Sequence, residues 1–247
     1  MWDDARQLNA IAVTLTAIAL AFLAWAGAGW IARQPAFGIS EVVVTTALRR
    51  ASPAHLDSVI RGELSGTFFT MDLDAARESI SRVPWVRAVA LRRQWPHRLE
   101  VAIDEHQPLA RWNDSGLVDA EGDVFVASYA GDLPQFDGPD GQSQVMAQRY
   151  RQWGALLAPL PLHVTGLVLS PRGGWQILAQ GDGGDLTMHV GRDDVDARLA
   201  RFVAAYGRTL AVLSRDGRHV DRVDLRYRNG FAAHVPGFRE KPARRKS

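Results

Sequence analysis

The longest run of apolar residues lies near the N-terminus, between Arg6 and Arg33, where no charged residue occurs. Residues 11–32 would form an α-helix about 33 Å long, and the hydrocarbon core of a bilayer is about 30 Å thick. A cleaved signal peptide is the alternative, because the small residues at 24–28 resemble a cleavage site. Apolar regions of signal peptides are only about 7–15 residues long. We therefore expect an uncleaved transmembrane helix at 11–32, preceded by a short N-terminal segment, 1–10.

After the span, the spacing of apolar positions predicts a small α+β unit over residues 37–107. β-branched residues dominate 37–46, which favours a strand. Helical spacing follows in two segments whose predicted N-caps are Ser52 and Asp72. Two strands around a turn at Trp95-Pro96 complete a β-α-α-β-β order. Such a unit buries one face of a sheet under two helices.

A second, β-rich unit is predicted over residues 108–235. Strand-like runs and turn residues alternate along it, and "LPQFDGPDG" at 133–141 is expected to be a loop. Helical periodicity appears at 142–157 and again at 191–213, where Asp193 or Asp194 is the predicted N-cap. The fold class is therefore α+β: one membrane helix, a β-α-α-β-β domain, and a β-rich domain with two amphipathic helices.

The last predicted element is a hairpin in "VDLRYRNGFAAHV". An Asn-Gly pair at Asn229-Gly230 is a strong hairpin signal, so residues 223–227 and 231–235 are expected to pair antiparallel. The second strand would then be the last of its sheet, with one row of backbone groups unpartnered. Proteins rarely leave such an edge unmanaged, because it accepts other strands.

Charge and composition narrow the classes of partner. The net charge is +2, and residues 236–247 carry five basic residues against Glu240, which leaves about −2 for the rest. This balance argues against a nucleic-acid-binding body, and we expect 236–247 to be a basic disordered tail. The chain has no cysteine, so disulfides and thiol chemistry are excluded.

Candidate catalytic or metal-binding groups are few. The seven histidines show no metal-ligand spacing, and no nucleophile elbow or phosphate-binding loop occurs. Glu100, Asp104 and Glu105 form the best carboxylate cluster, but strand alternation places Glu100 and Asp104 on a solvated face. Asp119, Glu121 and Asp123 suggest calcium, but a charged hairpin tip explains them without an ion. We expect an interaction protein without enzymatic activity, cofactor, metal or small-molecule substrate.

Several stretches in order resemble the bacterial cell division family FtsQ, also called DivIB. They are "MWDDARQLN", "WPHRLEVAIDEHQPLARW", "LVDAEGDVF", "LPQFDGPDG", "GRDDVDARLARF" and "VDLRYRNGFAAHV", which together span residue 1 to about 235. The resemblance implies a cytoplasmic N-terminus, one inner-membrane span, a periplasmic POTRA domain and a periplasmic β domain. It thereby suggests the orientation that the flanking charges leave open.

The resemblance also implies an essential scaffold role at the division septum. FtsQ-like proteins hold FtsB and FtsL, among other divisome membrane proteins, in a complex that regulates septal peptidoglycan synthesis. Their contact with FtsB is by strand addition at the C-terminal edge of the β domain. The residues that carry over to this contact are Arg226, Tyr227, Asn229, Phe231, Ala232, Ala233, His234 and Val235. Many relatives end this strand in Gly-Trp, where this chain has His234-Val235.

Two other function classes remain open at this stage. One is a membrane-anchored envelope hydrolase that uses Glu100 or Asp104. The other is a POTRA-type component of a transport or chaperone system acting on unfolded substrates. The second often requires a membrane β-barrel.

Overall fold

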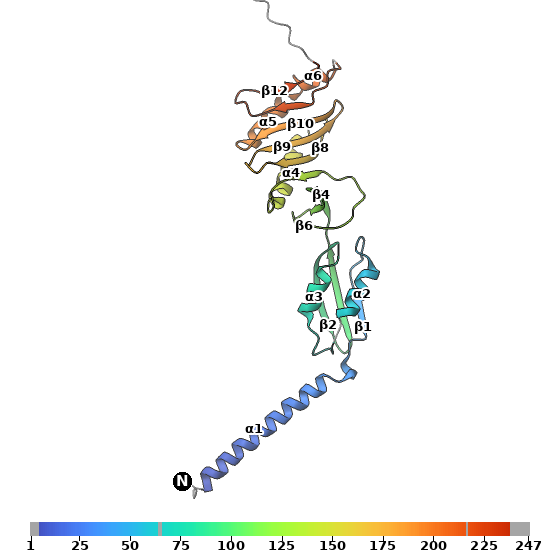
Figure 1. Ribbon diagram of the computed structural model, residues 1–247, viewed down its shortest axis with the longest axis vertical. Helices are drawn as coiled ribbons and strands as arrows, with labels where there is room; N and C mark the ends of the chain where they lie inside the picture. Colours follow the sequence, from blue (N-terminus) through green and yellow to red (C-terminus); the bar gives the residue numbers. More distant parts are fainter. Residues whose placement is uncertain (1–4, 64–65, 216, 238–247) are drawn as a thin grey trace, which may run out of the picture. The chain divides into compact units, whose positions relative to one another are not determined.

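The computed structural model describes residues 5–63, 66–215 and 217–237 (Figure 1). The chain divides into two compact units, Met1–Glu105 and His106–Ser247. Most of the predicted basic tail, from residue 238 on, lies outside the described residues, as do residues 1–4 of the predicted cytoplasmic segment.

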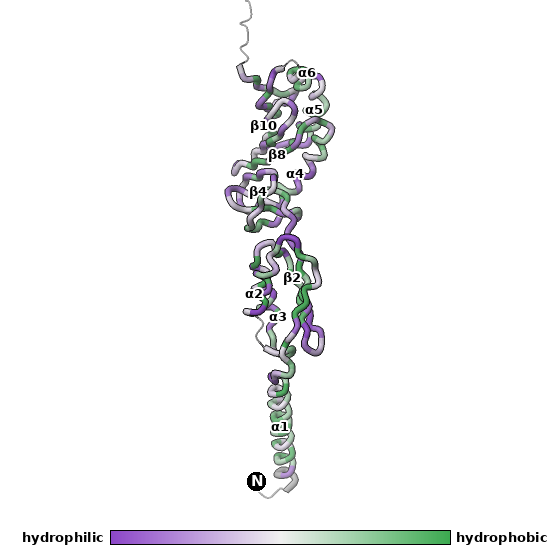
Figure 2. Tube along the Cα trace, turned by 90° about the vertical axis from the view of Figure 1, so that its right-hand side faces the viewer, coloured by the Kyte–Doolittle hydropathy of each residue, from purple (hydrophilic) through white to green (hydrophobic). Residues whose placement is uncertain are grey.

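The first element is the long apolar helix α1, Ala5–Ala32, which Figure 2 shows mostly in green. Its stretch Asn9–Ala32 is long and apolar enough to cross a bilayer, and it is not buried against the protein. The hydroxyls of Thr14 and Thr16 donate to the carbonyl oxygens of Ala10 and Ala12, each at 2.8 Å. Since lipid offers no hydrogen-bond partners, such internal pairing suits a lipid-facing helix. α1 therefore fits a single-pass membrane anchor.

The rest of the first unit has the predicted β-α-α-β-β order. After a short 3₁₀ turn, its elements are β1 (Glu41–Val44), α2 (Pro53–Glu63), α3 (Leu73–Ser81), β2 (Val86–Gln94) and β3 (Arg98–Glu105). The strand order is β1-β3-β2, with β1 parallel and β2 antiparallel to β3. Asp72 caps α3 as predicted, because its Oδ1 accepts from the N–H groups of Asp74 and Ala75 at 2.9 and 3.1 Å.

The alternation predicted for β3 is confirmed. Leu99, Val101 and Ile103 are buried, whereas the residues between them are more exposed. α3 packs on the sheet next to β2 and contacts α2, and Leu56 and Ile80 contribute one fully buried side chain from each helix. Burial of such a side chain stabilises the fold by about 1.5–3 kcal/mol.

The second unit is built on a nine-stranded sheet with the order β12-β11-β10-β9-β8-β7-β4-β5-β6. Its strands are β4 (Pro108–Trp112), β5 (Gly116–Asp119), β6 (Val124–Phe125), β7 (Gln135–Asp137), β8 (Leu162–Leu169), β9 (Trp175–Gly181), β10 (Gly184–Gly191), β11 (Arg222–Asp224) and β12 (Ala232–His234). The helices are α4 (Ser143–Leu157), α5 (Val195–Tyr206) and α6 (Leu210–Arg215). The unit is therefore β-rich, as predicted.

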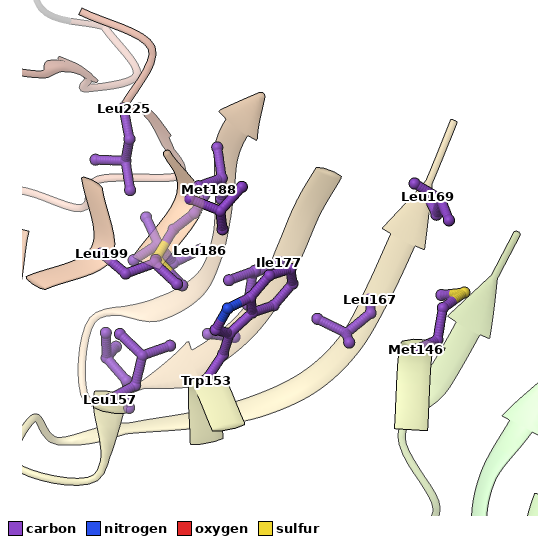
Figure 3. Close-up of a cluster of buried hydrophobic side chains, with 14 of the residues drawn as sticks. Met146, Trp153, Leu157, Leu167, Leu169, Ile177, Leu186, Met188, Leu199 and Leu225 are labelled. Carbon is purple, nitrogen blue, oxygen red and sulfur yellow. The ribbon is translucent and has the colours of Figure 1, made fainter. Parts of the chain in front are cut away.

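One continuous apolar cluster holds this unit together, and Figure 3 shows part of it. α4 and α5 contribute Trp153, Leu157 and Leu199, which meet Ile177 and Met188 of the central strands. The indole N–H of Trp153 donates to Oδ1 of Asp196 at 2.7 Å, so the two helices are also tied by a polar contact.

Three details of the second unit differ from the sequence expectation. The stretch 133–141 is not all loop, because Gln135–Asp137 forms β7 between β4 and β8. The helix predicted over 191–213 is split into α5 and α6 at Gly207, since glycine is a poor helix former and the Thr209 hydroxyl donates back to the carbonyl of Ala205. Asp194 stands at the start of α5 but makes no side-chain cap, and its φ of 52° is left-handed.

Candidate functional site: the free edge of the second sheet

The candidate site is β12, the terminal strand of the nine-stranded sheet. β11 runs parallel to β10 and aligns Val223 with Met188, and β12 returns antiparallel so that Ala233 lies opposite Val223. Among the described residues, no strand lies beyond β12. β12 is therefore a free edge, as the sequence predicts.

The hydrogen-bond pattern determines which backbone groups of β12 face outward. The N–H of Leu225 donates to His189 O, and Asp221 O accepts from the N–H of Thr187, both at 2.9 Å. By alternation, the backbone groups of residues 223 and 225 face β10, whereas those of 222 and 224 face β12. At Asp221 only the C=O faces β10, because its N–H donates to His234 O at 3.3 Å. Ala232 and His234, the partners of 224 and 222, thus face β11. The N–H and C=O of Ala233 point to the open edge.

Two of the three side chains of β12 are alanine methyl groups, which leave this edge accessible. Ala232, Ala233 and His234 are all exposed. The flanking residues Phe231 and Val235 are partly buried against the apolar cluster and so fix both ends of the strand. An incoming strand would meet little steric hindrance from side chains along β12.

The connection between β11 and β12 is longer than the two-residue Asn229-Gly230 turn that the sequence predicts. The antiparallel pairing covers only 222–224 with 232–234, so residues 225–231 form a loop. Burial explains the difference. Leu225 is 2% exposed and points into the cluster, where it lies with Met188 and Leu199 in Figure 3. Phe231 packs edge-on against Phe202 of α5, with centroids 5.5 Å apart.

The predicted contact residues within this loop differ in their environments. The guanidinium of Arg226 is bidentate to Asp224, with Nη2 2.6 Å from Oδ2 and Nε 2.9 Å from Oδ1. This hydrogen bonding lowers the pKa of Asp224. Tyr227 is 57% exposed and is therefore not a core residue. Asn229 is exposed and lies at the rim of a groove.

The other face of the edge carries charged and titratable groups. His234 Nδ1 lies 2.6 Å from Oδ1 of Asp221, and this contact lowers the pKa of the Asp221 carboxyl. His189, which is aligned with Asp224 across the parallel pair, has a lowered pKa because burial disfavours its charged form. The neighbouring arginines, Arg222 and Arg226, lower it further, while Asp224 opposes them.

A groove of about 280 Å³ lies beside the start of β12, between α5 and the loop 225–231. Phe202, Leu225 and Phe231 form part of its apolar lining, and Arg198, Arg201 and Arg208 add positive charge. Arg198 donates to the carbonyl of Val190 at 2.6 Å. In the part of the chain that the structure describes, Arg201 and Arg208 have no carboxylate partner. The groove therefore suits an apolar segment with negative charge.

Sequence reasoning missed these arginines, although a signal is present. Positions 198, 201, 202, 205 and 208 fall within an arc of about 120° on a helical wheel at 100° per residue. Basic and apolar residues thus share one face of the predicted helix 191–213. Only the packing of Phe231 against α5 reveals that this face lies next to the sheet edge.

Three of the carboxylates considered for catalysis or calcium, Asp104, Glu105 and Asp119, have structural partners. Asp104 is ion-paired with Arg87, and Glu105 accepts from the backbone N–H groups of Arg49, Arg50 and Ala51. Asp119 is fully buried: its Oδ2 lies 2.7 Å from His106 Nδ1, and its Oδ1 accepts from the N–H groups of Glu121 and Asp123. Within residues 5–63, 66–215 and 217–237, no group of three metal-ligating side chains gathers.

Comparison with known proteins identifies the family of this chain. Residues 37–106 match the family "POTRA domain, FtsQ-type", and residues 110–226 match "Cell division protein FtsQ/DivIB, C-terminal". The cell division protein FtsQ of Bordetella pertussis is 38% identical over the whole of both chains. That of Burkholderia pseudomallei is 36% identical over 97% of this chain and 96% of its own. FtsQ of Escherichia coli is 32% identical over 93% of this chain and 85% of its own. The chain belongs to the FtsQ/DivIB family of cell division proteins.

Proposed function

We propose that this protein is a non-enzymatic scaffold of the divisome that binds FtsB and FtsL through β12 and helps to control septal peptidoglycan synthesis. In this proposal the N-terminus is cytoplasmic, α1 crosses the inner membrane, and both folded units are periplasmic at the septum. The observation that carries it is the free edge at Ala233, together with membership of a cell division family.

Strand addition suits this edge but needs additional contacts. A partner strand would gain two main-chain hydrogen bonds at Ala233, and up to about five if the pairing extends to Phe231 and Val235, each worth about 0.5–1.5 kcal/mol. The entropic cost of association is about 4–15 kcal/mol, so hydrogen bonds alone give weak binding at best. Tyr227, exposed beside the edge, and the basic groove next to Phe231 are where further binding energy is available.

Substitution of Ala233 by proline tests whether FtsB binds at the open edge of β12. Because the N–H of Ala233 points outward, Ala233→Pro removes a donor from the open edge and leaves the donors that face β11 in place. We expect normal folding and loss of FtsB binding in a pull-down with the purified periplasmic region of FtsB.

The opposite edge of the same sheet offers a matched control. The N–H of Asp119 donates to Asp123 O. By alternation, the N–H and C=O of Val124, the next residue in β6, point away from β5. Val124→Pro therefore makes the same chemical change on the other free edge, and FtsB binding should persist. Full binding by a folded Ala233→Pro protein would refute strand addition at β12.

A further inference from the structure

Aromatic side chains gather at the end of the first unit where the chain leaves α1. The Phe69 ring packs edge-on against Phe37 and Phe68, with centroids 5.4 and 5.3 Å away. Phe69 nevertheless remains 53% exposed. Aromatic rings buried in this way on one side and open on the other are common at binding surfaces.

Hydrogen bonds hold this aromatic cluster at the C-terminal end of α1. The Thr67 hydroxyl donates to the carbonyl oxygen of Ala32, the last residue of the helix, at 2.5 Å. The N–H of Phe68 donates to Phe37 O at 2.7 Å. Phe69, two residues after Thr67, therefore lies near the end of α1 in space. It also contacts Phe37, which follows that end by five residues in the sequence.

The tip of the β2–β3 hairpin lies at the same end of the unit. The N–H groups of Ser40 and Glu41 donate to His97 O at 3.0 and 3.3 Å, which joins the tip to the segment that follows α1. Trp95, in this tip, is 71% exposed. Two loops distant in sequence thus present exposed aromatic rings beside the exit of α1.

The depth of α1 in a bilayer determines what these rings meet. Asn9–Ala32 spans about 36 Å, slightly more than the hydrocarbon core of about 30 Å, so Ala32 falls in the headgroup region. Trp and Tyr are enriched at this depth because their rings are amphipathic. The exposed cations Arg33 and Arg92 flank the same end and would meet anionic headgroups.

We infer that this end of the first unit is a membrane-contacting surface, in which Phe69 and Trp95 insert into the interface of the bilayer that α1 crosses. Phe37, Phe68, Phe69 and Trp95, with Arg33 and Arg92, make up this juxtamembrane face. The inference rests on α1 crossing the bilayer and not on the partner at β12. The experiments on the two surfaces can therefore fail separately.

The absence of cysteine makes the test direct. The full chain carrying Phe69→Cys, Trp95→Cys or Ser81→Cys is labelled with an environment-sensitive fluorophore. It is then reconstituted in vesicles of phosphatidylethanolamine and phosphatidylglycerol, with and without lipids carrying a nitroxide high on the acyl chain. Ser81 is the control, because it is exposed at the end of α3 and precedes Val86, which pairs with Glu105 at the far end of the sheet.

We expect the nitroxide lipids to quench the labels at 69 and 95 at least about twofold more than the label at 81. Equal quenching at all three positions would overturn the inference. Quenching at 69 and 95 that disappears as the lipid-to-protein ratio rises would overturn it as well, since contact with the bilayer would then depend on a second copy of the chain.

A second measurement keeps the native aromatic residue in place. A label at Gln94→Cys, beside native Trp95, is compared with the same label in a Trp95→Asp background. Insertion of Trp95 predicts that quenching at 94 falls at least about twofold in the Asp variant. Unchanged quenching there would show that Trp95 does not hold the hairpin tip at the bilayer.

Discussion

Tyr227 and Phe231 both lie in the loop before β12 but differ in burial. Phe231 packs on Phe202, whereas Tyr227 is 57% exposed. Phe231→Ala should lower the free energy of unfolding by about 1–2 kcal/mol, less than the 3–5 kcal/mol of a fully buried phenylalanine. Tyr227→Ala should leave stability within about 0.5 kcal/mol and weaken FtsB binding about tenfold, because exposed aromatic residues often anchor interfaces.

Denaturant unfolding and a binding titration on the same two variants distinguish these roles. Tyr227→Phe is the control, since it keeps the ring and removes only the hydroxyl. A Tyr227→Ala protein that binds FtsB with native affinity would remove Tyr227 from the proposed contact. A destabilised Tyr227→Ala protein would contradict its exposed position.

His189 predicts a pH dependence for the second unit. Burial lowers its pKa below the ordinary value of about 6.5, so the unfolded chain binds a proton more readily than the folded chain does. The stability that neutral His189 confers is present above about pH 6.5 and is lost as the pH falls through the folded pKa. Between pH 7.5 and 5, unfolding midpoints should drop further for the native chain than for His189→Gln. Equal drops would exclude His189 as a source of acid sensitivity.

At the scale of elements, the positive charge in the groove between α5 and the loop 225–231 should affect partner binding. Arg201 lines the groove without a carboxylate partner in the described part of the chain, so its charge is available to a bound segment. Arg201→Glu should weaken FtsB binding about tenfold and make binding less sensitive to salt, whereas Arg201→Lys should retain most of it.

Arg82→Glu is a control for the change in net charge, because Arg82 is exposed at the end of α3 in the other unit. Surface plasmon resonance at two salt concentrations measures both effects. If Arg201→Glu and Arg82→Glu weaken binding equally, the groove makes no specific contribution.

The elements differ in how far sequence could predict them. Alternation in Leu99, Val101 and Ile103, and the cap at Asp72, are local signals, and both predictions are confirmed. β7 was missed because its pairing is parallel and its partners, β4 and β8, are distant in sequence. The loop 225–231 was missed for a related reason: the Asn-Gly signal is local, whereas the core contacts of Leu225 and Phe231 are not.

At the scale of the whole molecule, the proposed scaffold makes a cellular prediction. Cells depleted of the protein should grow as filaments without septa. Wild-type chain and Val124→Pro should restore division, and Ala233→Pro should not, provided that immunoblots show equal amounts. Fluorescence microscopy with a membrane dye measures cell length and septum frequency. Normal septation after depletion would refute the division role.

The candidate site also shows a limit of sequence reasoning at this scale. The edge strand 231–235 was predictable, because turn and strand signals lie within one short stretch. The arginines of α5 were not assigned to it, since Arg201 precedes β12 by about thirty residues and only the fold brings them together. The same holds for Phe69 and Trp95 at the juxtamembrane face.

Among the described residues, no strand lies beyond β12 or β6, so the nine-stranded sheet has two open edges. The difference between these edges affects how many chains can join the sheet. Copies that joined β12 to β6 of the next copy would form an open-ended polymer, because such a head-to-tail contact does not close. β6 is only two residues long, Val124–Phe125, and offers few hydrogen bonds to such a neighbour. A different chain on β12 would terminate the series after a single addition. The sheet therefore favours one partner strand per chain and a discrete complex over a fibre.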